Sequence, residues 1–156
     1  MQTTPKISVI IPTLNEEKLI VKTLEQFTPQ LKERYNIEII ISDGGSTDGT
    51  LSLLSSLVDK IVNAEAGVKQ NIPQGRNAGA KAADGEFLYF LNADTMIQDA
   101  ELFFSNSLKA FSLEWNFALT CRFHVFPEDV KLSDKMFHGF YNNYVRLLNA
   151  AGMGMG

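Results

Sequence analysis

Three positions that follow an apolar run are the first candidates for chemistry in this 156-residue chain. Phe87 to Leu91 form a segment of strand length, and Asn92, Ala93 and Asp94 come directly after it. In open α/β sheets, ligands bind beyond the carboxyl ends of the strands. The Asp94 carboxylate is therefore expected to meet substrate and a hard cation there, and a plain turn is the alternative.

Asp43 occupies the corresponding place after the apolar run 37–42. A carboxylate only accepts hydrogen bonds, so Asp43 would select a nucleobase that presents an N–H, such as the imide of uracil. Gly44 opens a glycine-rich loop whose backbone can approach a ligand closely. The alternative is an Asx turn in which Ser46 or Thr47 caps the next helix.

The loop after the first apolar run, 6–11, is the third candidate. Pro12 ends that run, and Thr13, Asn15 and Glu16 follow at the edge that Asp43 is expected to share. Thr13 and Glu16 also have the spacing of a capping box. Helix capping is therefore the alternative to ligand binding at these positions.

Arg76 is the one cation among the candidates. We place it in the first turn of a predicted helix over 76–83, where the helix macrodipole disfavours a positive charge. A phosphate or an acidic neighbour would stabilise the guanidinium at that position. A solvated surface arginine is the alternative.

The elements that position these residues alternate along the chain. Apolar runs of strand length alternate with segments of helical periodicity, which predicts an α/β fold with a mostly parallel sheet flanked by helices. The predicted strands are 6–11, 37–42, 61–62 and 87–91, and the helical segments are 19–27, 51–58, 76–83 and 102–111. A clean alternation over 117–125 predicts one more strand, with Cys121 on its buried face.

Composition excludes several classes of protein. At 45% hydrophobic and 21% charged residues the chain can bury one core, and a net charge of −4 argues against nucleic acid as a partner. The single Cys121 rules out an internal disulfide and fits a reducing compartment, so we expect a cytoplasmic protein. An apolar stripe over 136–148 predicts a partner surface: this domain, a second subunit, the inner face of a membrane, or a further segment.

Four segments in order carry a family resemblance: residues 8–16, 42–50, 75–79 and 90–95. With them the chain resembles the family 2 glycosyltransferases, which have the Rossmann-like GT-A fold. The resemblance implies inverting transfer of a sugar from a nucleoside-diphosphate sugar, UDP favoured, with Mn²⁺ or Mg²⁺ as cofactor. The acceptor class, whether glycan, lipid-linked or small molecule, stays open.

The same resemblance assigns a nucleotide-sugar site and a metal ligand, Asp94. The implied nucleotide-sugar residues are Pro12, Thr13, Asn15, Glu16, Asp43, Gly44, Arg76, Asn92 and Ala93. Asn92 departs from the family pattern, which has an aspartate there. Its amide oxygen can still accept a hydrogen bond or coordinate a cation, but it carries no charge, so metal affinity should fall.

The resemblance also implies a division of the chain. We expect a donor-binding core over 1–126 and a helical segment over 127–156 that begins an acceptor-binding part, with the catalytic base beyond Gly156. A dinucleotide-binding oxidoreductase would need a Gly-x-Gly-x-x-Gly turn after the first strand, which residues 12–16 lack. A non-catalytic nucleotide-binding or protein-interaction module of the same fold is the alternative.

Overall fold

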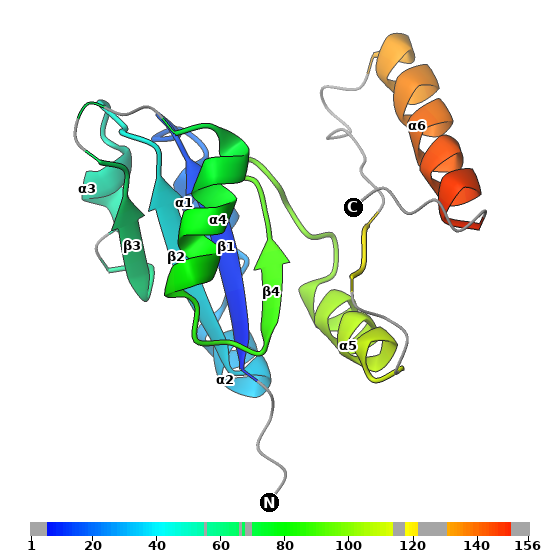
Figure 1. The fold of residues 1–156 in the computed structure, drawn as a ribbon, viewed down its shortest axis with the longest axis horizontal. Coiled ribbons are helices and arrows are strands. Elements are labelled where there is room, and N and C mark those ends of the chain that lie inside the picture. The colour runs from blue at the N-terminus through cyan, green and yellow to red at the C-terminus, as the bar shows by residue number, and fades with distance from the viewer. Residues whose placement is uncertain are drawn as a thin grey trace, which may run out of the picture. The chain divides into compact units, whose positions relative to one another are not determined.

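A parallel sheet of four strands, in the order β3-β2-β1-β4, forms the centre of the fold (Figure 1). The computed structural model describes residues 6–54, 56–65, 67, 70–113, 118–121 and 131–150. The strands are β1 Ile7–Thr13, β2 Ile37–Asp43, β3 Lys60–Asn63 and β4 Phe87–Phe90. Each pairing between neighbours is parallel, which confirms the predicted α/β class.

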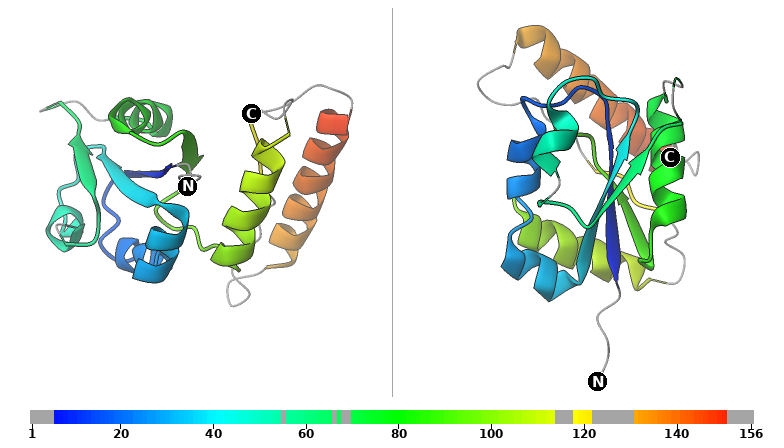
Figure 2. Two further views of the ribbon diagram at one scale, coloured as in Figure 1. Left: turned by 90° about the horizontal axis from the view of Figure 1, so that it is seen from below. Right: turned by 90° about the vertical axis from the view of Figure 1, so that its left-hand side faces the viewer.

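Helices cover both faces of this sheet. Figure 2 shows α4 on one face and α1, α2 and α3 on the other. The helices are α1 Ile20–Glu25, α2 Pro29–Tyr35, α3 Thr50–Leu54, α4 Ile72–Ala82, α5 Ala100–Phe111 and α6 Leu132–Ala150. The chain divides into two compact units, Met1–Phe104 and Ser105–Gly156, so the boundary falls within α5. The predicted boundary at residue 126 lies outside the described residues and stays a prediction.

The core of the first unit lies around β1 and β2. Every residue of β2 is buried, and Pro12 alone in β1 is partly exposed. An aromatic cluster around the buried Phe104 closes the face opposite α4, where Phe27, Tyr35 and Tyr89 contact its ring. Burying one large apolar side chain contributes about 1.5–3 kcal/mol, so these strands supply much of the free energy of folding.

Pro12 does not end the first strand, contrary to the sequence-based prediction. β1 continues to Thr13, and Pro12 lies opposite Ser42 in the register with β2. Even-numbered residues of β1 direct their backbone groups toward β4, as the bond from Leu91 N to Ile10 O shows. The pairing with β4 extends only to Ile10, so the N–H that proline lacks is not needed there.

β4 is not fully buried, although a short and continuously apolar run favours a strand that is buried on both faces. It lies at the edge of the described sheet, and its side chains alternate between half-buried and exposed. Leu88 and Phe90 are 40% and 45% exposed, whereas Tyr89 packs against Phe104 on the other face. In an edge strand with one covered face, the exposure of the side chains alternates in this way. The apolar run alone therefore did not predict how far β4 is buried.

Two helices begin elsewhere than predicted. α1 starts at Ile20 and its N-cap residue Leu19 makes no side-chain cap, so the capping interpretation of Thr13 and Glu16 is wrong. α4 starts at Ile72, with a capping box formed by Asn71 and Gln74. Arg76 is therefore the fifth residue of its helix and not part of the first turn, so the macrodipole acts on it only weakly.

The second unit differs from prediction at Cys121. Most of the strand predicted over 117–125 lies outside the described residues, and the described part, 118–121, is not a strand. Cys121 is exposed and is not the core residue that the alternation predicted, since no strand pairing buries it. Within the described ranges, every helix is too short or too polar to cross a lipid bilayer.

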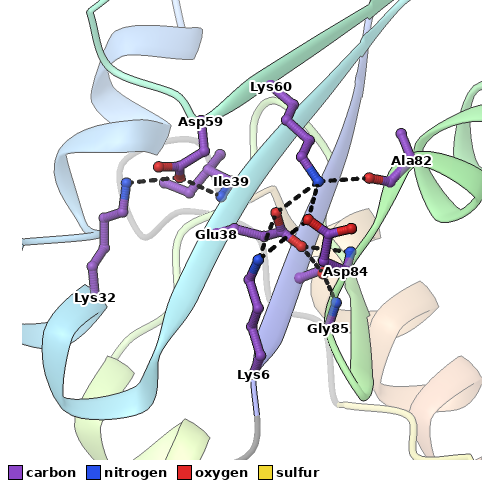
Figure 3. A network of polar contacts seen from close by, with 10 residues as sticks. Lys6, Lys32, Glu38, Ile39, Asp59, Lys60, Ala82, Asp84 and Gly85 are labelled. Atoms are coloured by element: carbon purple, nitrogen blue, oxygen red, sulfur yellow. Dashed lines mark hydrogen bonds and ion pairs between the residues drawn. The ribbon is translucent and has the colours of Figure 1, made fainter.

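An ion-pair network around the buried Glu38 connects the amino ends of the strands (Figure 3). Glu38 of β2 is 5% exposed and accepts hydrogen bonds from Ser8 Oγ at 2.6 Å and Asp84 N at 2.7 Å. Lys6 and Lys60 lie 3.3 and 3.1 Å from its other oxygen. Burial alone would raise the pKa of Glu38, but these hydrogen bonds lower it to about 2.

Candidate functional site

A pocket of about 610 Å³ opens at the edge of the sheet opposite the Glu38 network, beyond the carboxyl ends of β1, β2 and β4. Because β1 lies between β2 and β4, the segments that follow these strands converge over its end. The pocket is lined by Pro12, Thr13, Leu14, Glu16, Ser42, Gly44, Gln70, Asn71, Ile72, Pro73, Gly75, Asn92, Ala93 and Asp94. Seven of the ten residues predicted for the site are in this lining; Asn15, Asp43 and Arg76 are not.

Asn15 holds the first loop against the glycine-rich loop instead of lining the pocket. Its N–H donates to Ser46 Oγ at 2.9 Å, and its Oδ1 accepts from Thr47 N at 2.8 Å. The backbone of Asn15 is left-handed, with φ of 58°, a conformation that asparagine tolerates better than most residues. In addition, Glu16 N donates a hydrogen bond to Thr50 Oγ1 at 2.8 Å. The two loops thus form one wall that presents Glu16 to the pocket.

Negative charge gathers where Glu16 faces the turn after β4. Burial raises the pKa of Glu16, and the carboxylates of Asp94 and Asp48 raise it further. Like charges near one another disfavour the ionised form of Glu16. A divalent cation at Asp94 would relieve the repulsion, so the donor set is suited to a hard metal.

The turn that carries Asp94 is fixed from the opposite face of the sheet. Ala93 is buried, and its carbonyl accepts a bond from Thr23 Oγ1 at 2.6 Å. Gln26, the C-cap residue of α1, donates a hydrogen bond to Thr95 O at 3.1 Å and accepts one from Ile97 N at 2.8 Å. Asp94 itself stays exposed at the pocket. Within the described residues no three His, Cys, Asp or Glu side chains converge on a metal centre. A cation at Asp94 would thus take further ligands from substrate phosphates, as Mg²⁺ commonly does.

Arg76 reaches this turn from α4. Its Nη2 donates to Asn92 Oδ1 at 3.1 Å, whereas its buried Nε has no hydrogen-bond partner among the described residues. The neighbour that we expected to be a phosphate or an acid is thus an amide. An amide carries no charge, so it does not neutralise the guanidinium. Arg76 can therefore still attract an anion that binds close to Asn92.

Asp43 adopts the Asx turn that the sequence left as the alternative, but neither Ser46 nor Thr47 caps the next helix, because α3 starts at Thr50. Its Oδ2 accepts from Gly45 N and Ser46 N, both at 2.9 Å, and its Oδ1 accepts from Ser46 Oγ at 2.5 Å. A carboxylate has about four acceptor sites, so one site on Oδ1 is not used by these bonds. The buried Asp43 therefore shapes the loop, and contact with a nucleobase stays a prediction.

Three polar lining residues, Ser42, Gln70 and Asn71, were not predicted from the sequence. Ser42 is the last residue before Asp43, and Gln70 comes from the segment before α4. Ser42 Oγ, Gln70 Oε1 and Thr13 Oγ1 are buried without a hydrogen-bond partner among the described residues. The strand-end position of Ser42 was a usable signal, whereas Gln70 lies in a polar loop that has no periodicity.

The model of the family described as Glycosyl transferase family 2 matches residues 8–142. A curated relative from Methanococcus voltae, named dolichyl N-acetyl-alpha-D-glucosaminyl phosphate 3-beta-D-2,3-diacetamido-2,3-dideoxy-beta-D-glucuronosyltransferase, is 40% identical over 91 residues. That match covers 56% of this chain and 28% of the relative. The chain therefore spans less than a third of that protein.

Two solved structures are similar in fold. The mannosyltransferase PcManGT from Pyrobaculum calidifontis, in complex with GDP-Man and Mn²⁺, has a TM-score of 0.64 at 23% identity over 82% of this chain and 38% of that one. Glucosyl-3-phosphoglycerate synthase from Mycobacterium tuberculosis, in complex with Mn²⁺, UDP-glucose and phosphoglyceric acid, has a TM-score of 0.51 at 25% identity. This second match covers 64% of this chain and 36% of that one.

Proposed function

This chain belongs to glycosyl transferase family 2 and has the GT-A fold, and we propose that its pocket binds a nucleoside-diphosphate sugar for transfer of the sugar to an acceptor. The observation that carries the proposal is the convergence of residues from three strand ends in one pocket. Asp94, Glu16 and Gly44 come from three separate segments of the resemblance, and all line that pocket.

We place the diphosphate at the β4 side of the pocket. Asp94 provides a carboxylate there, and Arg76 lies beside Asn92 with a guanidinium that makes no ion pair with an acid in the described part of the chain. Opposite charges on these two side chains suit a metal-bound diphosphate. The Mn²⁺ and UDP-glucose in the complex of the 25% identical glucosyl-3-phosphoglycerate synthase support this choice of donor and metal.

In this proposal Asp94 holds Mn²⁺ or Mg²⁺ together with the phosphates, while the Asn92 amide orients Arg76. A bound cation would stabilise the negative charge that develops on the departing diphosphate. Arg76 stabilises the same charge by hydrogen bonding, because its guanidinium donates but never accepts. Pro12, Thr13 and Ala93 complete the walls around the donor.

Direct displacement with inversion is the reaction that we propose. A base must lie within hydrogen-bond reach of the acceptor hydroxyl, on the side of the sugar away from the diphosphate. The prediction that this base lies beyond Gly156 stays a prediction. The acceptor class stays open, as do the cytoplasmic location and the predicted contact of 136–148 with a subunit or membrane surface.

A non-catalytic nucleotide-binding module is the second candidate, and Asn92 is the observation that favours it. An aspartate there would add a charged ligand, whereas the amide of Asn92 is held by Arg76. A module of this kind would bind the donor and leave it intact.

Calorimetry with UDP, GDP and CDP, each with and without Mn²⁺, tests the proposed donor site. We expect Mn²⁺ to tighten binding of UDP by at least tenfold. Absence of binding by all three nucleotides in the presence of Mn²⁺ would contradict the proposal. Slow Mn²⁺-dependent hydrolysis of UDP-glucose, lost in Asp94→Ala, would then separate an enzyme from a binding module.

A further inference from the structure

We propose that Ser42 and Gln70 form a polar recess that recognises the nucleobase of the donor, an inference that rests on the proposed function. Both residues line the pocket, and the recess lies between the ends of β1 and β2 and the first turn of α4. It would supply the specificity of the site at the end away from the metal.

The two side chains have unused hydrogen-bonding capacity. Ser42 is 1% exposed, and its Oγ has no hydrogen-bond partner among the described residues. Gln70 Oε1 is also buried and has no hydrogen-bond partner within the part of the chain that the structure describes. Buried polar atoms are bonded in the great majority of cases, and an unsatisfied one costs about 1–3 kcal/mol. A ligand that bonds both atoms would recover that free energy.

Gly75 shows that the two oxygens border one small space. A Cβ atom added at Gly75 would lie 3.7 Å from Ser42 Oγ and 3.9 Å from Gln70 Oε1. The same atom would lie 3.0 Å from Pro12 Cβ, closer than ordinary van der Waals contact, so Pro12 or α4 would have to shift. A side chain at this position would therefore enter the space between the two polar groups. Glycine keeps the recess open and lets α4 approach the strand ends.

The register of the sheet determines which part of a nucleotide reaches this recess. Ser42 belongs to β2, and the turn with Asp94 follows β4, with β1 between them. Two strand spacings separate these positions, roughly 10 Å. A nucleotide whose diphosphate lies at Asp94 therefore extends its nucleoside toward β2.

The chemistry of the recess suits a nucleobase better than a phosphate. A hydroxyl donates and accepts, and a carboxamide presents both an acceptor and donors. The edge of a nucleobase offers a donor next to an acceptor, so one base can bond both side chains. Neither Ser42 nor Gln70 carries the positive charge that a phosphate would require for strong binding. Asp43 would accept an N–H of the base, and the recess would bond its remaining polar atoms.

The test compares Ser42→Ala and Gln70→Met with the control variants Ser52→Ala and Gln30→Met. Ser52 and Gln30 are exposed and do not line the pocket. Calorimetry of the 156-residue chain uses two probes, UDP with Mn²⁺ and inorganic pyrophosphate with Mn²⁺. We expect each recess variant to weaken UDP binding by about 3- to 15-fold. Pyrophosphate binding should change less than twofold, and the controls should match the unmodified protein with both probes.

Thermal unfolding separates ligand recognition from a structural role, because loss of a structural hydrogen bond would lower the Tm. Ser42→Ala removes a hydroxyl that bonds nothing in the described protein, so its Tm should equal or exceed that of the unmodified chain. If the unmodified chain binds UDP and both variants bind it within twofold, the recess proposal fails and the donor site stands. Equal weakening of UDP and pyrophosphate would also overturn the recess. Failure of the unmodified chain to bind UDP, GDP or CDP would overturn the donor site and the recess together.

Discussion

Arg76 donates a hydrogen bond to Asn92 over 3.1 Å, from Nη2 to Oδ1, and this bond joins α4 to the turn after β4. The pair brings a cation and an amide to the edge of the pocket, where the family pattern would place a cation beside an acid. The turn therefore keeps its geometry but lacks one negative charge. Asp94 is left as the charged residue of the turn that lines the pocket.

Asn92→Asp should strengthen Mn²⁺-dependent binding of UDP by about fivefold. The new carboxylate would add a charged group beside the proposed metal, and hydrogen bonds to a charged acceptor are roughly twice as strong as those to a neutral one. Calorimetry with and without Mn²⁺ measures the effect. Asn106→Asp on α5 is the control for added charge, since Asn106 is exposed and outside the pocket lining. Weaker binding in Asn92→Asp would mean that the neutral amide is required.

Asp94→Ala should abolish the dependence of nucleotide binding on Mn²⁺, since it removes the carboxylate that we assign to the metal. The same titration on Glu86→Ala provides the control, because Glu86 precedes β4 at the opposite end of the strand. The metal assignment is wrong if Asp94→Ala still binds UDP more tightly with Mn²⁺ than without it.

Asp43→Ala should weaken binding of UDP and GDP by about 1.5–3 kcal/mol, the range for a hydrogen bond to a charged group. CDP should lose less, because cytosine lacks the ring N–H that the free acceptor site of Asp43 would take. Calorimetry with the three nucleotides makes the comparison. Equal losses for all three would show that Asp43 acts through its bonds to Gly45 and Ser46 alone.

Glu38→Gln should make the protein less stable near neutral pH and less sensitive to acid. The pKa of Glu38 is about 2 in the fold against an ordinary 4.5, so the folded state binds fewer protons than the unfolded state between these values. Its contribution, about 2–4 kcal/mol, is present above pH 4.5 and lost as pH falls toward 2.

Chemical denaturation from pH 2 to 7 measures this contribution as the difference between the two stability curves. The difference should be largest near pH 7 and shrink toward pH 2. Glu25→Gln, at an exposed position of α1, is the control. A constant difference across the whole range would show that Glu38 contributes through packing and not through its charge.

Gly79→Ala should lower the free energy of unfolding by about 1–3 kcal/mol, because the added methyl would overlap Ile10 Cγ2 on the central strand. Gly139→Ala on α6 is the matched control, since nothing lies within 4 Å of the position its methyl would occupy. That variant should be stabilised by up to about 1 kcal/mol through helix propensity. Denaturant unfolding measures both, and an unchanged Gly79→Ala would contradict the close approach of α4 to β1.

The sequence alone determined the fold class and the segments that form the site. Apolar runs such as 37–42 end in Asp43, and the alternation of strands with helices requires a parallel sheet. Parallel strands bring their carboxyl ends to one edge, so Thr13, Glu16 and Asp94 could be assigned to one site from their order in the chain. These are local properties, because the period of the apolar residues and the turn chemistry act over a few positions.

The tertiary structure decided how each side chain is used. Arg76 and Asn92 meet across 16 positions of sequence, and no local pattern indicates this pairing. Ser42 and Gln70 became site residues only because α4 packs against the strand ends at Gly75. Burial of β4 was misjudged for the same reason, since the neighbours of a strand depend on its place in the sheet. Hydrogen bonding and burial between distant segments depend on packing, and packing is settled only when the whole domain folds.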